Sequence, residues 1–517
     1  MSDATDTTGR DSLPPNGRPE EVRVVISDLH MGEGSKVTVE YDGKRGASRV
    51  WRAIDGWLSR RPKDEEIDNP LEDFHYDDEF AALLEALDER YGDVPVCLVL
   101  LGDTFDPLHV TWRGRYSDPP YEAVGAAKMR KIIAAHPKFF AALRRFLTAS
   151  PDRSIELYVG NHDQFLCWPE VQRLFLEAVT GGEAGYREAG LTGRIFIVDH
   201  EEGFERLHRG VLYTHGMNAE AHNAIDPENA IVDEVLGQKL KYPILNMPLG
   251  SYMVTDLVAK LKSRNPLVGR VHGDRRVWAH AFRHRWSWGL YSGIMLLWAL
   301  IYANFFAFID VRRKASLRRM LGTVRATWEK NPVDRFFKRL LRKRADALAV
   351  IGGHSHNFCR LSTEDGTYVN TGSWARAYRL VEYEFERTWT RFQRLEFYWR
   401  ALQHFFRTGE NRFGTRLAAF IGVLALISAM VAFLIGGFEQ GISDSFWATA
   451  LSNLKVPVGI LLTFVVVGAI FRLFSVPPDI VENTRFTFAL VRHFPDGGLK
   501  VDLMEWLPEE DAMIECV

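Results

Sequence analysis

The sequence predicts an α/β fold, and two observations lead to this prediction. Short β-branched runs alternate with helical patterns, and small clusters of Asp, His, Asn and Gly directly follow five of the runs. The 517 residues are 46% hydrophobic and 25% charged, a globular composition that excludes a mainly disordered chain. The net charge of −3 excludes a bulk polycation, so we expect no nucleic-acid partner. The four widely spaced cysteines form no C-x-x-C, which fits a reducing compartment.

The expected elements begin after a polar tail. Residues 1–20 contain Pro and Gly but no apolar run, which predicts a disordered tail and not a signal peptide. The run VRVVIS from Val22 is typical of a buried parallel strand, and helical patterns cover 77–91 and 138–147. Similar strand runs lie at 96–101, 155–159, 195–198, 211–214 and 347–351, and a terminal strand pair is expected from 486–492 and 499–506.

The five polar clusters hold the residues that can carry chemistry. They lie at 27–30, 102–106, 160–163, 214–216 and 352–356. Open α/β sheets place their sites at the carboxyl ends of strands, so we expect the clusters to meet. Imidazole, carboxylate and amide side chains suit Mn, Fe or Zn, and the absence of Cys from the clusters excludes a thiolate site. Seven such ligands are too many for one tetrahedral ion and enough for two ions that share a carboxylate.

The order of the clusters, D-x-H, G-D-x-x-D, G-N-H-D, H and G-H-x-H, closely resembles that of the calcineurin-like metallophosphoesterase superfamily. The run YVNTGSW at 368–374 is also similar to the family. The resemblance implies a four-layer α/β sandwich in which two central mixed sheets are flanked by helices. It also implies two metal ions. One would take Asp28, His30 and His356, the other would take Asn161, His215 and His354, and Asp103 would bridge both.

The same resemblance implies a hydrolase with phosphatase chemistry. Two divalent ions, manganese first with iron or zinc as alternatives, would lie about 3.5–4 Å apart and lower the pKa of a shared water, whose hydroxide attacks phosphorus. His162 would stabilise the transition state or protonate the leaving oxygen, while Asp163 and Asp106 would orient other groups. A phosphomonoester, a phosphodiester and a diphosphate all remain candidate substrates, lipid-linked ones included.

Three apolar runs predict association with a membrane. Residues 289–309 and 417–438 are uncharged and about 20 residues long, which is enough to span a bilayer, and 456–474 is shorter. Four Arg against one Glu in 400–416 predict a transmembrane hairpin over 417–474 with both ends in the cytoplasm. Basic residues flank 289–309 on both sides, so this run predicts a re-entrant or interfacial helix, with a buried core helix as the alternative.

The predicted domain organisation is one catalytic domain with two insertions. The domain comprises 22–240, 346–380 and 484–507, and the insertions are a helical cap at 241–345 and a helical segment with the hairpin at 381–480. The basic amphipathic stretch 312–345 predicts a helix at an anionic membrane surface or a solvated basic face. We expect membrane lipids and a phosphate ester as partners and the catalytic domain on the cytoplasmic face. The alternative is a membrane-anchored scaffold with an inactive phosphatase fold.

Overall fold

The computed structural model describes residues 17–38, 66–113, 119–187, 189–220, 222–235, 237–263, 270, 332–381 and 479–516. The chain divides into two compact units. The first unit contains the described residues up to Ala377 and those from Asn483 onward. Of the second unit, the described residues form the antiparallel pair β14 (Tyr378–Val381) and β15 (Asp479–Glu482).

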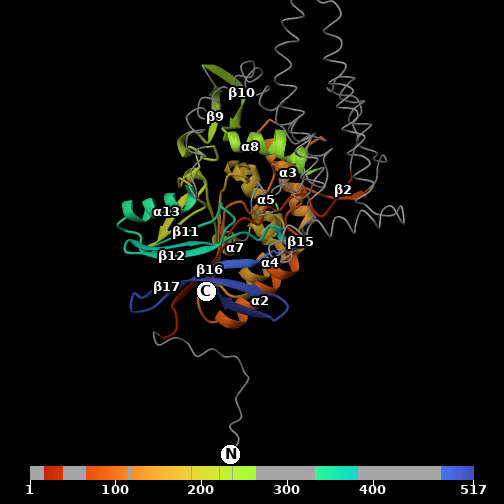
Figure 1. Ribbon diagram of the computed structural model, residues 1–517. Helices are drawn as coiled ribbons and strands as arrows, with labels where there is room; N and C mark the ends of the chain where they lie inside the picture. The colour runs from red at the N-terminus through yellow and green to blue at the C-terminus, as the bar shows by residue number, and fades with distance from the viewer. Residues whose placement is uncertain are drawn as a thin grey trace, which may run out of the picture. The chain divides into compact units, whose positions relative to one another are not determined.

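A seven-stranded mixed sheet is the larger sheet of the first unit (Figure 1). Its order is β18-β17-β16-β1-β4-β5-β6. The strands are β1 (Glu21–Ile26), β4 (Val96–Leu101), β5 (Arg153–Tyr158), β6 (Ile195–Val198), β16 (Phe486–His493), β17 (Leu499–Leu507) and β18 (Ala512–Glu515). The strands β1, β4, β5 and β6 run parallel, whereas β16, β17 and β18 are antiparallel. The predicted terminal strand pair is therefore confirmed, and it extends the sheet beside β1.

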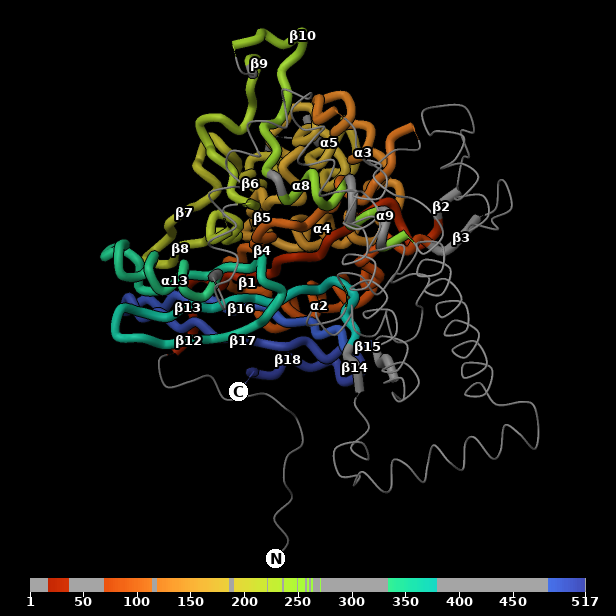
Figure 2. Tube along the Cα trace, turned by 45° about the horizontal axis from the view of Figure 1, so that its top comes forward, coloured from red at the N-terminus to blue at the C-terminus, as the bar shows by residue number. Residues whose placement is uncertain are grey.

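A five-stranded mixed sheet packs against the first. Its order is β12-β13-β11-β8-β7, with β8, β11 and β13 parallel and the two edge strands antiparallel. The strands are β7 (Glu205–His208), β8 (Val211–Thr214), β11 (Ala349–Gly352), β12 (Cys359–Thr363) and β13 (Gly366–Asn370). In Figure 2 the cyan strands β12 and β13 lie beside the blue β17, which contacts both.

Three clusters of buried apolar residues lie between the layers of sheets and helices. Alternate residues of β1 point to opposite faces, so Val24 packs against helices and Val25 packs against the second sheet. The helices on the first face are α2 (Asp77–Tyr91), α3 (Glu122–Ala135), α4 (Pro137–Ala149) and α5 (Pro169–Thr180). On the outer face of the second sheet, α13 (Pro332–Lys343) buries Phe337 and Leu341. The fold is thus mixed α/β, with two mixed sheets and helices, as the sequence predicts at this level.

Short elements connect these layers. They are β2 (Lys36–Thr38) with β3 (Glu66–Asp68), the hairpin of β9 (Ile231–Val235) and β10 (Gln238–Leu245), α6 (Glu183–Arg187), α7 (Ala189–Thr192), α8 (Leu249–Met253), a π-helical turn at Val254–Val258 and α9 (Ala259–Lys262). Figure 2 shows the β9–β10 hairpin reaching away from the two large sheets beside α8.

No helix among the described residues has the length and apolar character needed to cross a bilayer. The predicted membrane segments 289–309, 417–438 and 456–474 lie outside the described residues.

Candidate metal centre

The loops that follow β1, β4, β8 and β11 are joined by backbone hydrogen bonds. Asp28 N donates to Gly102 O at 3.1 Å, and His30 N donates to Asp103 O at 2.9 Å. Gly353 N donates to His215 O at 3.0 Å. These parallel strands end at the same edge of their sheets, so the polar clusters that follow them converge there.

The backbone is strained where these loops meet. Five non-glycine residues of the clusters have left-handed φ values between 49° and 69°: Asp28, His30, Asp103, His354 and His356. Each such conformation costs about 1–3 kcal/mol and persists only where the surrounding structure holds it in place. Because all five lie in the same loops, the fold stabilises an arrangement that the isolated chain disfavours.

Asp28, His30 and His356 form one group of ligand atoms. Nε2 of His356 lies 3.3 Å from Oδ1 of Asp28 and 3.1 Å from Nε2 of His30. Nε2 of His30 lies 3.8 Å from the same carboxylate oxygen. Asp28 and His30 are buried and His356 is partly exposed, so the group is open toward solvent on the His356 side.

Asp103, His215 and His354 form a second group. Nε2 of His215 lies 3.2 Å from Oδ2 of Asp103, and its Nδ1 lies 2.9 Å from Leu101 O, which holds the ring in place. Oδ2 of Asp103 also lies 3.9 Å from Nε2 of His30. The Asp103 carboxylate therefore faces both groups, which is the position of a bridging ligand.

The donor set fits a pair of divalent ions. In each group the ligand atoms lie within 4.8 Å of one another. Oδ1 of Asn161 and Nε2 of His215 are among the buried atoms of the described residues that have no hydrogen-bond partner. A buried polar atom without a partner is costly, and metal coordination would satisfy both atoms. Carboxylate, imidazole and amide donors suit Mn, Fe or Zn.

The charge of the site also favours cations. Burial alone would raise the pKa of Asp28 and of Asp103, but the neighbouring imidazoles, His215 foremost, hold the pKa of both carboxyls well below the ordinary range. Burial alone would lower the pKa of His215, but the charges of Asp103 and Asp28 raise it to about 9. The buried carboxylates are thus ionised, and a metal ion that binds His215 displaces the proton of its ring.

Two glycines allow the loops to approach so closely. A Cβ at Gly160 would collide with the Asp103 carboxylate and with its backbone N, and a Cβ at Gly353 would collide with Ser27 and Asp28. Neither glycine has a positive φ, so the absent side chain and not the backbone conformation is what the positions require. The G-N-H-D and G-H-x-H clusters therefore need their first glycine for space.

Asp106, which belongs to neither of these two ligand groups, lies close to three imidazoles. Its Oδ2 lies 3.1 Å from Nδ1 of His162, 2.7 Å from Nδ1 of His109 and 3.4 Å from Nδ1 of His30. The ring of His162 packs edge-on against His30, with 4.6 Å between centroids. Burial would lower the pKa of His162, but the carboxylates of Asp106 and Asp103 raise it. His162 therefore lies between Asp106 and His30, and the neighbouring carboxylates favour its protonated ring.

Asp163 holds the loops together. Oδ1 accepts from Gly160 N at 2.6 Å, and Oδ2 accepts from Thr104 N at 2.9 Å. The side chain is buried, and burial together with the charge of Asp103 raises its pKa to about 7. Through these hydrogen bonds the Asp163 side chain connects the loops after β4 and β5.

The sequence did not single out three residues that contact the site. His109 bonds Asp106, while Oε2 of Glu220 lies 3.1 Å from Nε2 of His354 and Nδ2 of Asn223 lies 3.4 Å from the same nitrogen. His109 follows the G-D-x-x-D cluster by three residues, which is a weak signal. Glu220 and Asn223 follow His215 in a segment without a motif, so nothing in the sequence marks them.

The chain was compared with known families, curated proteins and solved structures. No protein-family model matches the chain, and no curated protein matches it. Among solved structures, the chain is similar to a dimetal phosphatase from Danio rerio, with 10% sequence identity and a TM-score of 0.25. The match covers 69% of this chain and 88% of that one.

Proposed function

We propose that this chain is a metal-dependent phosphoric ester hydrolase of the calcineurin-like metallophosphoesterase kind. The observation that carries the proposal is the position of Asp103, whose Oδ2 faces His215 at 3.2 Å and His30 at 3.9 Å. One ion would be held by Asp28, His30 and His356 and the other by Asn161, His215 and His354. Manganese is the first candidate, with iron or zinc as alternatives.

When bound, the ions supply a water of lowered pKa and positive charge for the phosphoryl oxygens. The residues of the chain supply the orientation and the local charge. Asp103 keeps its orientation because His162 N donates to its Oδ1 at 2.8 Å. The buried carboxylates repel anions until cations are present, so we expect phosphate esters to bind only to the loaded site.

His162 provides the proton that the leaving oxygen needs. Asp106 holds its Nδ1 at 3.1 Å, which leaves Nε2 as the nitrogen free to face a substrate. The side chain is 17% exposed, against 1% for Asp106, so the imidazole is the more accessible of the pair. Proton transfer by such a group contributes about 10²–10⁴-fold to a rate.

The substrate class we propose is a phosphomonoester, phosphodiester or diphosphate, lipid-linked ones included. Support comes from the segment after β8, which reaches the site through Glu220 and Asn223 at His354 and through Ser251, whose Oγ donates to Asn161 O at 3.3 Å. The apolar runs 289–309 and 417–438 support placement at the cytoplasmic face of a membrane.

A metal-reconstitution assay tests the activity. The full chain is stripped with a chelator, manganese is restored, and hydrolysis of bis-p-nitrophenyl phosphate and of p-nitrophenyl phosphate is followed. Loss of a residue that only supports a metal ligand reduces activity about 10–100-fold. Because Asp103 would bind both ions directly, we expect Asp103→Asn to reduce kcat/KM by more than this. Asp78→Asn, at an exposed ion pair with Lys138, is the matched control and should leave the rate unchanged.

The scaffold alternative predicts a different result. A membrane-anchored protein with an inactive phosphatase fold would show no manganese-dependent hydrolysis of either ester in the wild-type chain. An Asp103→Asn variant with full activity would refute the shared-carboxylate centre. For the membrane part, reporter fusions at residues 275 and 325 should both report the cytoplasmic side, and opposite sides would contradict the proposed topology.

A further inference from the structure

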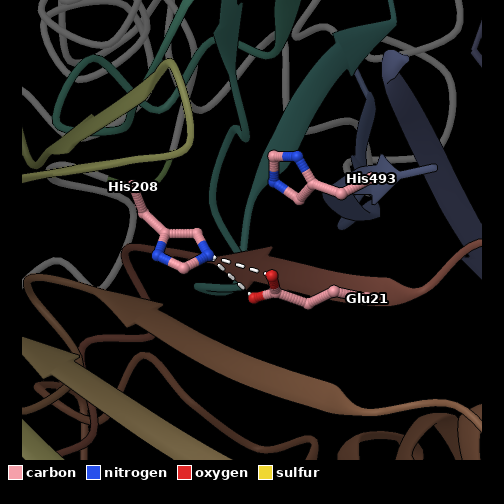
Figure 3. Close-up of side chains that lie close together, drawn as sticks. All are labelled: Glu21, His208 and His493. Carbon is pink, nitrogen blue, oxygen red and sulfur yellow. Dashed lines mark hydrogen bonds and ion pairs between the residues drawn. The ribbon is translucent and has the colours of Figure 1, made fainter. Parts of the chain in front are cut away.

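Two histidines and a glutamate from three strands meet far from the candidate metal centre (Figure 3). Glu21 begins β1 and His493 ends β16, and the two are register partners in the antiparallel pairing. Partners in such a pairing project on the same face of the sheet. His208 ends β7, an edge strand of the other sheet, so the three residues connect the two sheets.

We propose that Glu21, His208 and His493 form a separate site for one divalent ion of the zinc class. Nε2 of His208 lies 2.9 Å from Oε1 and 3.0 Å from Oε2 of Glu21. The ligand atoms of the three side chains lie within 4.8 Å of one another. A tetrahedral zinc ion with ligands at about 2.0–2.1 Å places them about 3.3 Å apart, so small side-chain rotations complete the site.

His493 gives an independent indication of a missing partner. The residue is 3% exposed, and its Nε2 is buried without a hydrogen bond to any of the described residues. Figure 3 shows both imidazole rings beside the Glu21 carboxylate, with His208 and His493 approaching from different sides. A coordinated ion would satisfy the His493 nitrogen, which is otherwise a costly buried polar atom.

The proposed site is partly open to solvent. The side chains of Glu21 and His208 are 20% and 27% exposed, which leaves room for water as a fourth ligand.

Two arginines also face Glu21 and compete with a cation. Arg23 Nη1 lies 3.4 Å from Oε1, and Arg209 Nη1 lies 3.5 Å from Oε2. Each arginine has a closer carboxylate partner, Glu156 for Arg23 and Glu20 for Arg209. The arginines therefore keep their main ion pairs when an ion replaces the Glu21–His208 contact.

The proposed site can be tested separately from the dinuclear centre. Glu21 begins β1, whose six residues span about 20 Å at 3.3 Å per residue, and Asp28 lies two residues beyond its last residue, Ile26. An ion here would tie the edge strand β7 to β1 and β16. Its expected role is structural, since it would fasten the two sheets at the end away from the catalytic loops.

Zinc counting on the full chain decides the proposal. The protein is stripped with a chelator, equilibrated with zinc against a chromophoric competitor, and its bound zinc is measured by elemental analysis. We expect His208→Gln and His493→Gln each to bind one zinc fewer than the wild type. His200→Gln is the matched control, because its 21% exposed side chain belongs to no three-residue ligand group among the described residues.

Thermal unfolding in the Asp103→Asn background separates this site from the proposed hydrolase. There, zinc should still raise the unfolding midpoint, and adding His208→Gln should reduce that rise, because the other candidate ligands of the dinuclear centre are the same in both variants. His208→Gln decides the outcome if the buried His493→Gln variant does not fold. An unchanged zinc number in His208→Gln, with an unreduced rise of the midpoint, would show that the three residues form only a hydrogen-bonded pair beside a buried histidine.

Discussion

Nδ1 of His162 lies 3.1 Å from Oδ2 of Asp106, so the carboxylate lies against one ring nitrogen and leaves Nε2 for the proposed proton transfer. We expect His162→Gln to lower kcat by about 10²–10⁴-fold for alkyl phosphates, whose alkoxide leaving groups need a proton. The loss should be much smaller for p-nitrophenyl esters, because that leaving group departs as an anion. Equal losses on both substrates would contradict the proton-donor role.

We expect Asp106 to act on the same proposed reaction through His162. Asp106→Asn should therefore shift the pH profile of alkyl phosphate hydrolysis while leaving p-nitrophenyl ester hydrolysis closer to the wild-type rate. The variant keeps the volume of the side chain, but it removes the negative charge that faces His162, His109 and His30. An unaltered profile with an unaltered rate would show that the carboxylate is only structural.

Glu220 is expected to tune metal binding through His354. Its Oε2 lies 3.1 Å from Nε2 of His354, and this hydrogen bond lowers the pKa of the Glu220 carboxyl. Outer-shell partners of this kind are worth about 10–100-fold in metal affinity, so Glu220→Gln should lose manganese at correspondingly lower chelator concentration. Glu228→Gln, an exposed change in the same segment, should match the wild type.

Much of the fold could be predicted because buried strands have an unambiguous composition. The apolar runs at 96–101, 195–198 and 211–214 coincide with β4, β6 and β8, and the helical pattern at 77–91 coincides with α2. The edge strands β7 and β12 could not be found this way, since their residues are only partly buried and form no apolar run. An edge strand has one unpaired side and less need for apolar residues.

The site shows a similar division. The polar clusters were predicted to converge because each follows a strand, and parallel strands end at one edge of a sheet. In the structure Nε2 of His356 lies 3.3 Å from Oδ1 of Asp28, although more than 300 residues separate them in the sequence. Glu220 and His109 were missed because each contacts the site as a single residue outside any motif. Which loop places a side chain against a metal-ligand residue depends on tertiary packing. No local sequence pattern indicates such a contact.

The amphipathic stretch 312–345 shows that the sequence of an apolar helix face does not reveal whether protein or lipid covers it. The sequence predicted a membrane surface or a solvated basic face, but within 332–343 the apolar face is covered by protein. Phe337 stacks on Tyr368 with 4.5 Å between centroids and is fully buried. The basic side of α13 can still face solvent or lipid, so only the assignment of its apolar face changes.

This packing predicts a large loss of stability for one variant. Phe337→Ala should lower the free energy of unfolding by about 3–5 kcal/mol, because it removes a fully buried ring and leaves a cavity against Tyr368. Phe336→Ala, at the partly buried neighbouring position, should cost clearly less. Denaturant unfolding followed by tryptophan fluorescence measures both. Equal costs would mean that α13 is not anchored on the sheet through Phe337.

The buried His136 lies outside the candidate metal sites and should make the stability depend on pH. His136 is 2% exposed, and its Nδ1 lies 3.1 Å from Oδ2 of Asp77 while Nε2 lies 3.6 Å from Oε2 of Glu72. Burial would lower the pKa of His136, but these two carboxylates raise it to about 9. The folded protein therefore holds this proton more tightly than the unfolded chain, in which the pKa is about 6.5.

A raised pKa in the folded state makes the stabilisation greatest at low pH. The contribution of His136 should be complete below about pH 6.5 and disappear as the pH rises through about 9, with an upper size of about 3 kcal/mol at about 1.4 kcal/mol per pKa unit. The difference in unfolding free energy between wild type and His136→Gln should accordingly shrink between pH 6 and pH 10. A constant difference across that range would show that the imidazole is neutral in the folded protein, and the two carboxylates would then need another source of positive charge.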